Sequence, residues 1–156
     1  MKRSFFAKTF AIAAGAALAL SLAPTAKADD KGCSNAILRG TFAYTSTGSI
    51  ATPPAIAGPF VEVGTQAFDG NGGTTAAAMS SQNGNISPLT VTGTYKVNPD
   101  CTGTMTLQVT FPGFPTFPVD VYFVVDDGGD EFQAIETDPG LVITRLGRKL
   151  YPGRNN

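Results

Sequence analysis

Eight short runs rich in Val, Thr, Phe and Tyr follow one another along this chain, and each is bounded by a cluster of Gly, Pro, Asn or Asp. This composition and punctuation are typical of β-strands. The runs cover residues 41–50, 60–69, 73–81, 89–97, 102–111, 116–126, 130–137 and 141–149. Beyond residue 28, Gly, Pro, Thr and Val interrupt the chain too often for apolar residues to recur at helical spacing. The sequence therefore predicts an all-β fold.

The connections between these runs are of two kinds. The second, fourth and sixth are compact and polar, at 69–73, 98–101 and 126–130, whereas the first and fifth, at 51–59 and 112–118, are long, apolar and rich in proline. In an up-and-down meander, odd and even connections lie at opposite ends. We therefore predict an antiparallel, up-and-down, eight-stranded barrel with one tightly closed end and one end rimmed by apolar loops. A two-sheet β-sandwich is the alternative, because turn signals do not reveal whether the first and last strands pair.

The N-terminal segment has the pattern of a secretory signal peptide. Three basic residues, Lys2, Arg3 and Lys8, precede an apolar run at 9–22, and an Ala-Lys-Ala cleavage motif follows at 26–28. The apolar run is shorter than the roughly 20 residues that a membrane-spanning helix needs, and no later run is long enough to span a membrane. We therefore expect an exported bacterial protein, periplasmic or extracellular. The predicted parts are a signal peptide at 1–28, a lead-in at 29–40, a barrel domain at 41–149 and a C-terminal tail at 150–156.

Charge narrows the range of partners. Without residues 1–28 the chain keeps seven basic and twelve acidic residues, so its net charge is −5. A negative surface without a basic cluster argues against binding nucleic acid or an anionic membrane. The one basic stretch, at 145–149 with Arg154, is interpreted as solvated charge on a strand end and tail.

The two cysteines predict a structural disulfide. In exported chains, paired cysteines are commonly oxidised to a disulfide. Cys33 and Cys101 would both lie at the closed end of the predicted barrel, where they could meet. A redox-active pair is the alternative, but the C-x-x-C spacing typical of such pairs is missing.

The chain has no histidine, which excludes Ser-His-Asp and Cys-His catalysis and the commonest zinc sites. We expect neither a metal nor a cofactor. The catalytic candidates are weak: the strand carboxylates Glu62, Asp120 and Glu136, and Tyr95. A carboxylate inside an apolar barrel would have a raised pKa and could transfer protons. The simpler interpretation is that these acids face water and that Glu136 pairs diagonally with Arg145.

Aromatic residues supply the candidate ligand contacts. Phe114 and Phe117 lie in a proline-rich loop and either rim the barrel mouth or fold inward and plug it. Phe123 alternates with polar residues in the sixth run and shares a predicted inward face with Val119, Val121 and Val125. The full candidate set is Tyr44, Tyr95, Phe114, Phe117, Tyr122 and Phe123.

The segments 38–42, 68–72, 93–103 and 132–137 resemble a group of small exported bacterial proteins and, more loosely, the allene-oxide-cyclase-like and lipocalin-like eight-stranded barrels. The resemblance covers essentially the whole chain after residue 28 and lies in strand order and turn spacing. It implies a barrel with an apolar interior. Some of these barrels are cofactor-free cyclases and others carry small hydrophobic ligands. No catalytic residue of those families maps onto a position here.

Three hypotheses follow. The first is an exported barrel that binds a small apolar molecule entering between the 51–59 and 112–118 loops. The second is a cofactor-free cyclase or isomerase with a strand carboxylate or tyrosine as its polar group, and the third is a non-enzymatic surface interaction protein. An inward carboxylate would favour the enzyme, an apolar cavity without one the carrier, and a plugged barrel the interaction protein.

Overall fold

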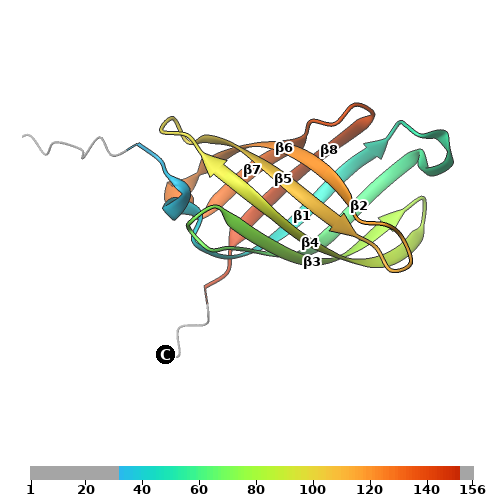
Figure 1. Ribbon diagram of the computed structural model, residues 1–156, viewed down its shortest axis with the longest axis horizontal. Helices are drawn as coiled ribbons and strands as arrows, with labels where there is room; N and C mark the ends of the chain where they lie inside the picture. The colour runs from blue at the N-terminus through green and yellow to red at the C-terminus, as the bar shows by residue number, and fades with distance from the viewer. Residues whose placement is uncertain (1–31, 152–156) are drawn as a thin grey trace, which may run out of the picture. The chain divides into compact units, whose positions relative to one another are not determined.

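A computed structural model describes residues 32–151 of the chain as a closed, antiparallel, eight-stranded barrel (Figure 1). The strands are β1 (Gly40–Ile50), β2 (Gly58–Phe68), β3 (Gly73–Gln82), β4 (Asn85–Val97), β5 (Thr102–Thr110), β6 (Phe117–Asp126), β7 (Glu131–Glu136) and β8 (Leu141–Lys149). Each strand pairs with its neighbour in sequence, and β8 pairs with β1. The predicted barrel is therefore confirmed and the β-sandwich is excluded. The predicted signal peptide and most of the predicted tail lie outside the described residues.

Short 3-10 helices complete the secondary structure: η1 (Asn35–Leu38) before the barrel, η2 (Pro54–Ile56) between β1 and β2, and η3 (Asp127–Gly129) between β6 and β7. No helix within residues 32–151 has the length and apolar character needed to cross a membrane.

The third connection is shorter than the one predicted from the sequence. The prediction ended one strand at 81 and began the next at 89, whereas β3 and β4 are joined by Asn83 and Gly84 alone. Both residues have positive φ, 51° and 83°. An Asn-Gly pair suits a two-residue hairpin whose twist matches that of its strands, so pairing continues up to the turn.

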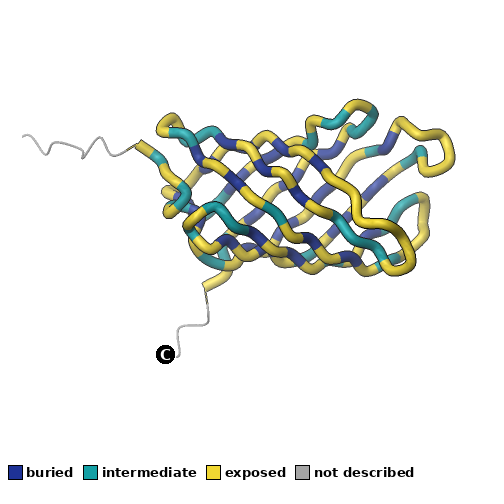
Figure 2. The backbone as a smooth tube through the Cα atoms, viewed as in Figure 1, coloured by how far each residue is buried: buried dark blue, intermediate teal, exposed yellow. Residues whose placement is uncertain are grey.

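Buried and exposed residues alternate along every strand, as the blue and yellow bands of Figure 2 show. In β6 the buried set is Val119, Val121, Phe123 and Val125, which confirms the predicted inward face. A two-residue period of this kind places alternate side chains inside the barrel and outside it.

The closed end, where η1 lies, is filled by aromatic rings. Phe42 and Phe68 meet edge to face with centroids 5.4 Å apart, Phe132 lies 5.6 Å from each of them, and Tyr95 lies 5.0 Å from Phe68. Leu38 of η1 is completely buried against this cluster. Tilted and edge-to-face rings at these distances attract one another beyond their area burial, so this end of the barrel is a packed core.

A disulfide between Cys33 and Cys101 joins the lead-in to the connection between β4 and β5, as predicted. The two cysteines are 68 positions apart in sequence. Closing a loop of this length stabilises the fold by about 4 kcal/mol in the chain-entropy treatment. The bridge therefore fastens the N-terminal segment to the closed end of the barrel.

Candidate functional site

The opposite end of the barrel contains a cavity of about 570 Å³. Its rim is formed by the two apolar loops, through Ala55, Ile56, Phe114, Pro115 and Phe117. Its walls are mainly aliphatic side chains of the strands, among them Leu89, Val91, Leu107, Val109, Val119 and Ile143. The predicted difference between the two ends is thus present, since the two long apolar loops rim an opening and polar turns surround a packed core. The open end also includes the short Asn83-Gly84 turn, because Asn83 lines the cavity.

Small residues make room in the middle of the barrel. The inward positions of β3 hold Thr74, Ala76, Ala78 and Ser80. Tyr44 on β1 pairs with a glycine on each side, Gly64 of β2 and Gly147 of β8. A side chain at Gly147 would overlap the Phe132 ring and one at Gly64 would overlap Ala77 and Ala78, so the two glycines permit close packing on either side of Tyr44.

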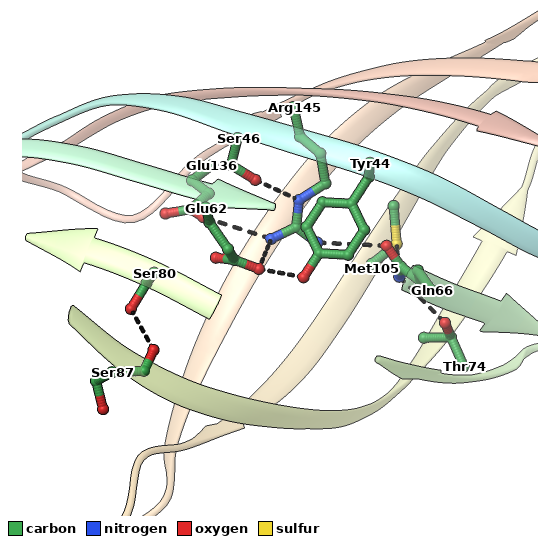
Figure 3. Close-up of polar contacts among 10 residues, drawn as sticks. All are labelled: Tyr44, Ser46, Glu62, Gln66, Thr74, Ser80, Ser87, Met105, Glu136 and Arg145. Carbon is green, nitrogen blue, oxygen red and sulfur yellow. Dashed lines mark hydrogen bonds and ion pairs between the residues drawn. The ribbon is translucent and has the colours of Figure 1, made fainter. Parts of the chain in front are cut away.

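Arg145 is the centre of a buried polar cluster at the inner end of the cavity (Figure 3). Its Nε donates a hydrogen bond to Ser46 Oγ at 2.9 Å, and its Nη1 donates to Gln66 Oε1 at 3.3 Å. Its Nη2 lies 3.9 Å from an oxygen of Glu62 and 3.9 Å from an oxygen of Glu136. The guanidinium carbon lies 4.5 Å from the centroid of the Tyr44 ring, within the range of a cation–π contact.

Glu62 and Tyr44 form a hydrogen-bonded pair within this cluster. The Tyr44 hydroxyl donates to Glu62 Oε1. Burial raises the pKa of the Tyr44 phenol well above its ordinary value, and the negative charge of Glu62 raises it further. The phenol therefore stays protonated, so that Glu62 has both a hydroxyl donor and the Arg145 cation beside it.

Glu136 differs from Glu62 in its surroundings. Within residues 32–151 its carboxylate makes an ion pair with Arg145 at 3.9 Å but accepts no hydrogen bond, and it lines the cavity. Burial raises the pKa of Glu136 to about 7; the Arg145 charge opposes this rise, and the charges of Glu62 and Asp138 add to it. Glu136 is thus a buried carboxyl group that can gain or lose a proton near neutral pH.

The structure brings together three of the predicted site residues, Tyr44, Glu62 and Glu136, in the polar cluster at the inner end of the cavity. Glu62 and Glu136 line the cavity, whereas Tyr44 does not. The predicted ion pair of Glu136 with Arg145 is present. The interpretation that the strand acids face water is wrong for Glu62 and Glu136, because both occupy inward positions of their strands.

Asp120 and Tyr122 lie on the outside of the barrel. Both occupy exposed positions of β6 that alternate with its buried valines and Phe123. Asp120 accepts a hydrogen bond from the Thr106 hydroxyl at 2.8 Å on the outer surface. Neither residue lines the cavity.

Tyr95 and Phe123 are inside the barrel but at the closed end. The Tyr95 hydroxyl accepts a hydrogen bond from the Gly70 amide and donates one to the Asn35 carbonyl, each at 3.0 Å. Phe123 is completely buried in the core. Each of the two residues lies near the end of its strand that is opposite the rim. Neither ring lines the cavity.

Phe114 and Phe117 rim the cavity mouth and do not plug it. Phe114 is 71% exposed, and Phe117 stacks on Phe111 with ring centroids 6.2 Å apart and planes 10° from parallel. All three rings line the cavity. Of the two arrangements predicted for this loop, the rim is the one observed.

Sequence reasoning missed Arg145, Gln66 and Ser46 as interior residues. The sequence pattern predicts a solvated charge at Arg145, and this prediction is wrong because Arg145 is a buried residue of β8. The available signal was its alternation with Ile143 and its pairing opposite Ala134, both on the buried face of the last hairpin. A charged residue in phase with buried neighbours has to be assigned to the interior along with them.

Comparisons with known proteins do not add to this description. A scan against models of protein families, a search of curated proteins and a search of solved structures each gave no match.

Proposed function

We propose that this protein binds a small, mainly apolar molecule inside the open end of its barrel. The observation that carries the proposal is the cavity of about 570 Å³, lined mostly by aliphatic and aromatic side chains. Small-molecule sites typically have volumes of about 300–1,000 Å³, apolar walls and a few polar groups that orient the ligand. The cluster around Arg145 supplies such polar groups at one place in the wall.

The rim supports binding through the open end. Phe114 and Phe117 expose ring surface beside the mouth, and the prolines of this loop limit its freedom. Exposed aromatic surface next to an apolar cavity is typical of a ligand entrance. A plugged barrel would have favoured the hypothesis of a surface interaction protein. The barrel has an open cavity instead, so that hypothesis is not favoured.

The proposed setting is outside the cytoplasm. The pattern of residues 1–28 supports export, and the Cys33–Cys101 disulfide is in keeping with an oxidising compartment. A barrel of this kind in the periplasm or the medium would carry or sequester its ligand. The resemblance to lipocalin-like barrels supports the same role.

Proton-transfer catalysis, as in a cofactor-free isomerase or cyclase, is the second candidate, because two carboxylates line the cavity and an inward carboxylate is the feature expected of an enzyme. Glu136, with a pKa of about 7, would be its general acid or base. The groups that could polarise a substrate are already engaged, however, since Tyr44 donates to Glu62 and Arg145 donates to Ser46 and Gln66. Binding is therefore the function that the geometry supports best.

Two valine-to-tryptophan variants test the cavity with Nile red, a neutral apolar fluorophore. Val109→Trp adds an indole at a residue that lines the cavity, whereas Val124→Trp adds it at an exposed position on the outer surface of β6. We expect the native protein to bind the dye and Val109→Trp to bind it about tenfold more weakly, a loss of about 1.4 kcal/mol. Val124→Trp should bind it with native affinity.

Native mass spectrometry of the protein purified from cells and from medium is the companion measurement. A retained small molecule that is absent from Val109→Trp would support the proposal and identify the ligand class. No dye binding by the folded native protein, together with a mass free of adducts, would refute it.

A further inference from the structure

The charged side chains that line the cavity include more acidic than basic groups. They are Glu62, Glu136 and Arg145, so two carboxylates share one guanidinium. With both acids ionised, the inner end of the cavity carries one excess negative charge. A buried charge without a full partner is costly, so a ligand that supplies the missing positive charge would be favoured.

Glu136 is the carboxylate with the most acceptor positions free for a ligand. Its side chain is only 10% exposed, and in the described part of the chain its polar partner is Arg145 Nη2 at 3.9 Å, beyond hydrogen-bond distance. Glu62, by contrast, accepts a hydrogen bond from Tyr44. Among the described residues neither oxygen of Glu136 accepts a hydrogen bond, whereas Glu62 has only Oε2 without a partner. Most of the unfilled acceptor capacity at the cavity surface therefore belongs to Glu136.

Arg145 has little capacity left for an anionic ligand. Its Nε and Nη1 donate to Ser46 and Gln66, and its Nη2 lies between the two carboxylates. Its face covers the Tyr44 ring. A fatty-acid carboxylate would bring a third negative charge to this cation and would have to displace existing partners.

We infer that the ligand is an apolar amine, with its hydrocarbon or aromatic body in the cavity and its ammonium group donating hydrogen bonds to Glu136. This inference rests on the proposed function and adds the chemical class of the ligand. The ammonium group balances the second carboxylate, and charge-assisted hydrogen bonds of this type are among the stronger ones in proteins. The aliphatic walls then accept the rest of the molecule.

The pH dependence of binding follows from the groups around Glu136. Arg145 of β8, Glu62 of β2 and Tyr44 of β1 face it from inside the barrel, Asp138 follows it on the chain, and the neighbouring β6 contributes Asp120, which points outward. Burial raises the pKa of Glu136 to about 7. An ammonium ligand needs the ionised carboxylate, so amine affinity should rise about tenfold from pH 6 to pH 8.

The test displaces Nile red with three twelve-carbon probes, dodecylamine, dodecanol and dodecanoate, each below its micelle concentration. We expect dodecylamine to displace the dye at a roughly tenfold lower concentration than dodecanol. Dodecanoate should be the weakest of the three. The amine advantage should grow from pH 6 to pH 8.

Glu136→Gln and Glu131→Gln form a matched pair of variants on β7. Glu131 pairs with the exposed Arg148 near the closed end and does not line the cavity. Glu136→Gln should lose the preference for amine over alcohol and its pH dependence, while Glu131→Gln should keep both. The pH profile of the native protein gives the same information independently of how well either variant folds.

The outcomes separate the two proposals. Equal displacement by all three probes, or strongest displacement by dodecanoate, would overturn the amine inference and leave the apolar cavity in place. Failure of the folded protein to bind Nile red or any of the probes would refute the proposed function and the inference with it.

Discussion

The two ends of the barrel are filled in different ways, although the same eight strands form both. At the closed end, Phe42, Phe68 and Phe132 meet ring against ring, and a disulfide ties Cys33 to Cys101. At the open end, aliphatic walls enclose about 570 Å³ of space beside a polar cluster. One end is built like an ordinary protein core and the other like a binding site.

The connections explain how the two ends differ. At the closed end, polar turns bring neighbouring strands together within a few residues; the Asp69 carboxylate, for example, accepts hydrogen bonds from the amides of Asn71, Gly72 and Gly73. At the open end, the loops that carry Ala55 and Phe114 are long and apolar and stand around the mouth. The packed core and the cavity therefore lie at opposite ends, and we expect that stability and the proposed binding can be altered separately.

Phe132→Ala and Phe114→Ala give the largest expected contrast. Phe132 is fully buried among aromatic rings, so its removal leaves a cavity and should cost about 3–5 kcal/mol of unfolding free energy. Phe114 is 71% exposed, and its removal should cost less than about 0.5 kcal/mol. Urea denaturation of both variants measures the difference. A loss of similar size for the two would contradict the division between the ends.

Removing the disulfide should lower stability without changing the cavity. Replacing Cys33 and Cys101 by alanine releases a loop of 68 positions at the closed end, which we expect to cost about 2–4 kcal/mol. Because the bridge is remote from the cavity lining, Nile red affinity of the folded double variant should stay native. A large loss of dye affinity at temperatures where the variant remains folded would show that the two ends are coupled.

Strand order, the barrel and the disulfide could be predicted from the sequence because each depends on local or topological rules. The alternation in β6 placed Val121 and Phe123 inside, and the meander placed both cysteines at one end. The barrel interior was harder to predict. In the last hairpin both faces carry apolar residues, as the exposed Ile135 and Val142 show, so hydrophobicity alone did not identify the inner face.

The polar cluster could be predicted only in part. The Glu136–Arg145 pair follows from the hairpin register, but its burial depends on β1 and β2, which are far away in sequence. Tyr95 shows the converse difficulty. It is an interior tyrosine, as expected of a ligand contact, yet its hydroxyl bonds to Gly70 and Asn35 at the closed end. Depth along the barrel axis requires the strand stagger, which the alternation pattern does not contain.

The smallest expected effect is the part of the pH dependence of the unfolding free energy that comes from Glu136. Its pKa is about 7 in the folded chain and 4.5 for the unperturbed group, so between these values the folded state binds more protons than the unfolded state. The contribution of Glu136 to the free energy of unfolding therefore falls as pH rises through this interval, by about 2–3 kcal/mol, and is constant above it.

The comparison of the native protein with Glu136→Gln isolates this contribution, because all other carboxyl groups are common to both. The native protein should lose stability relative to the variant as pH rises from 4.5 to 7, and urea midpoints over that range measure the difference. A Glu136→Gln curve parallel to the native one would mean that Arg145 offsets the effect of burial, so that Glu136 keeps its ordinary pKa in the folded chain. Glu136 would then be ionised throughout the interval from pH 6 to pH 8, and the expected rise of amine affinity over that interval would be wrong.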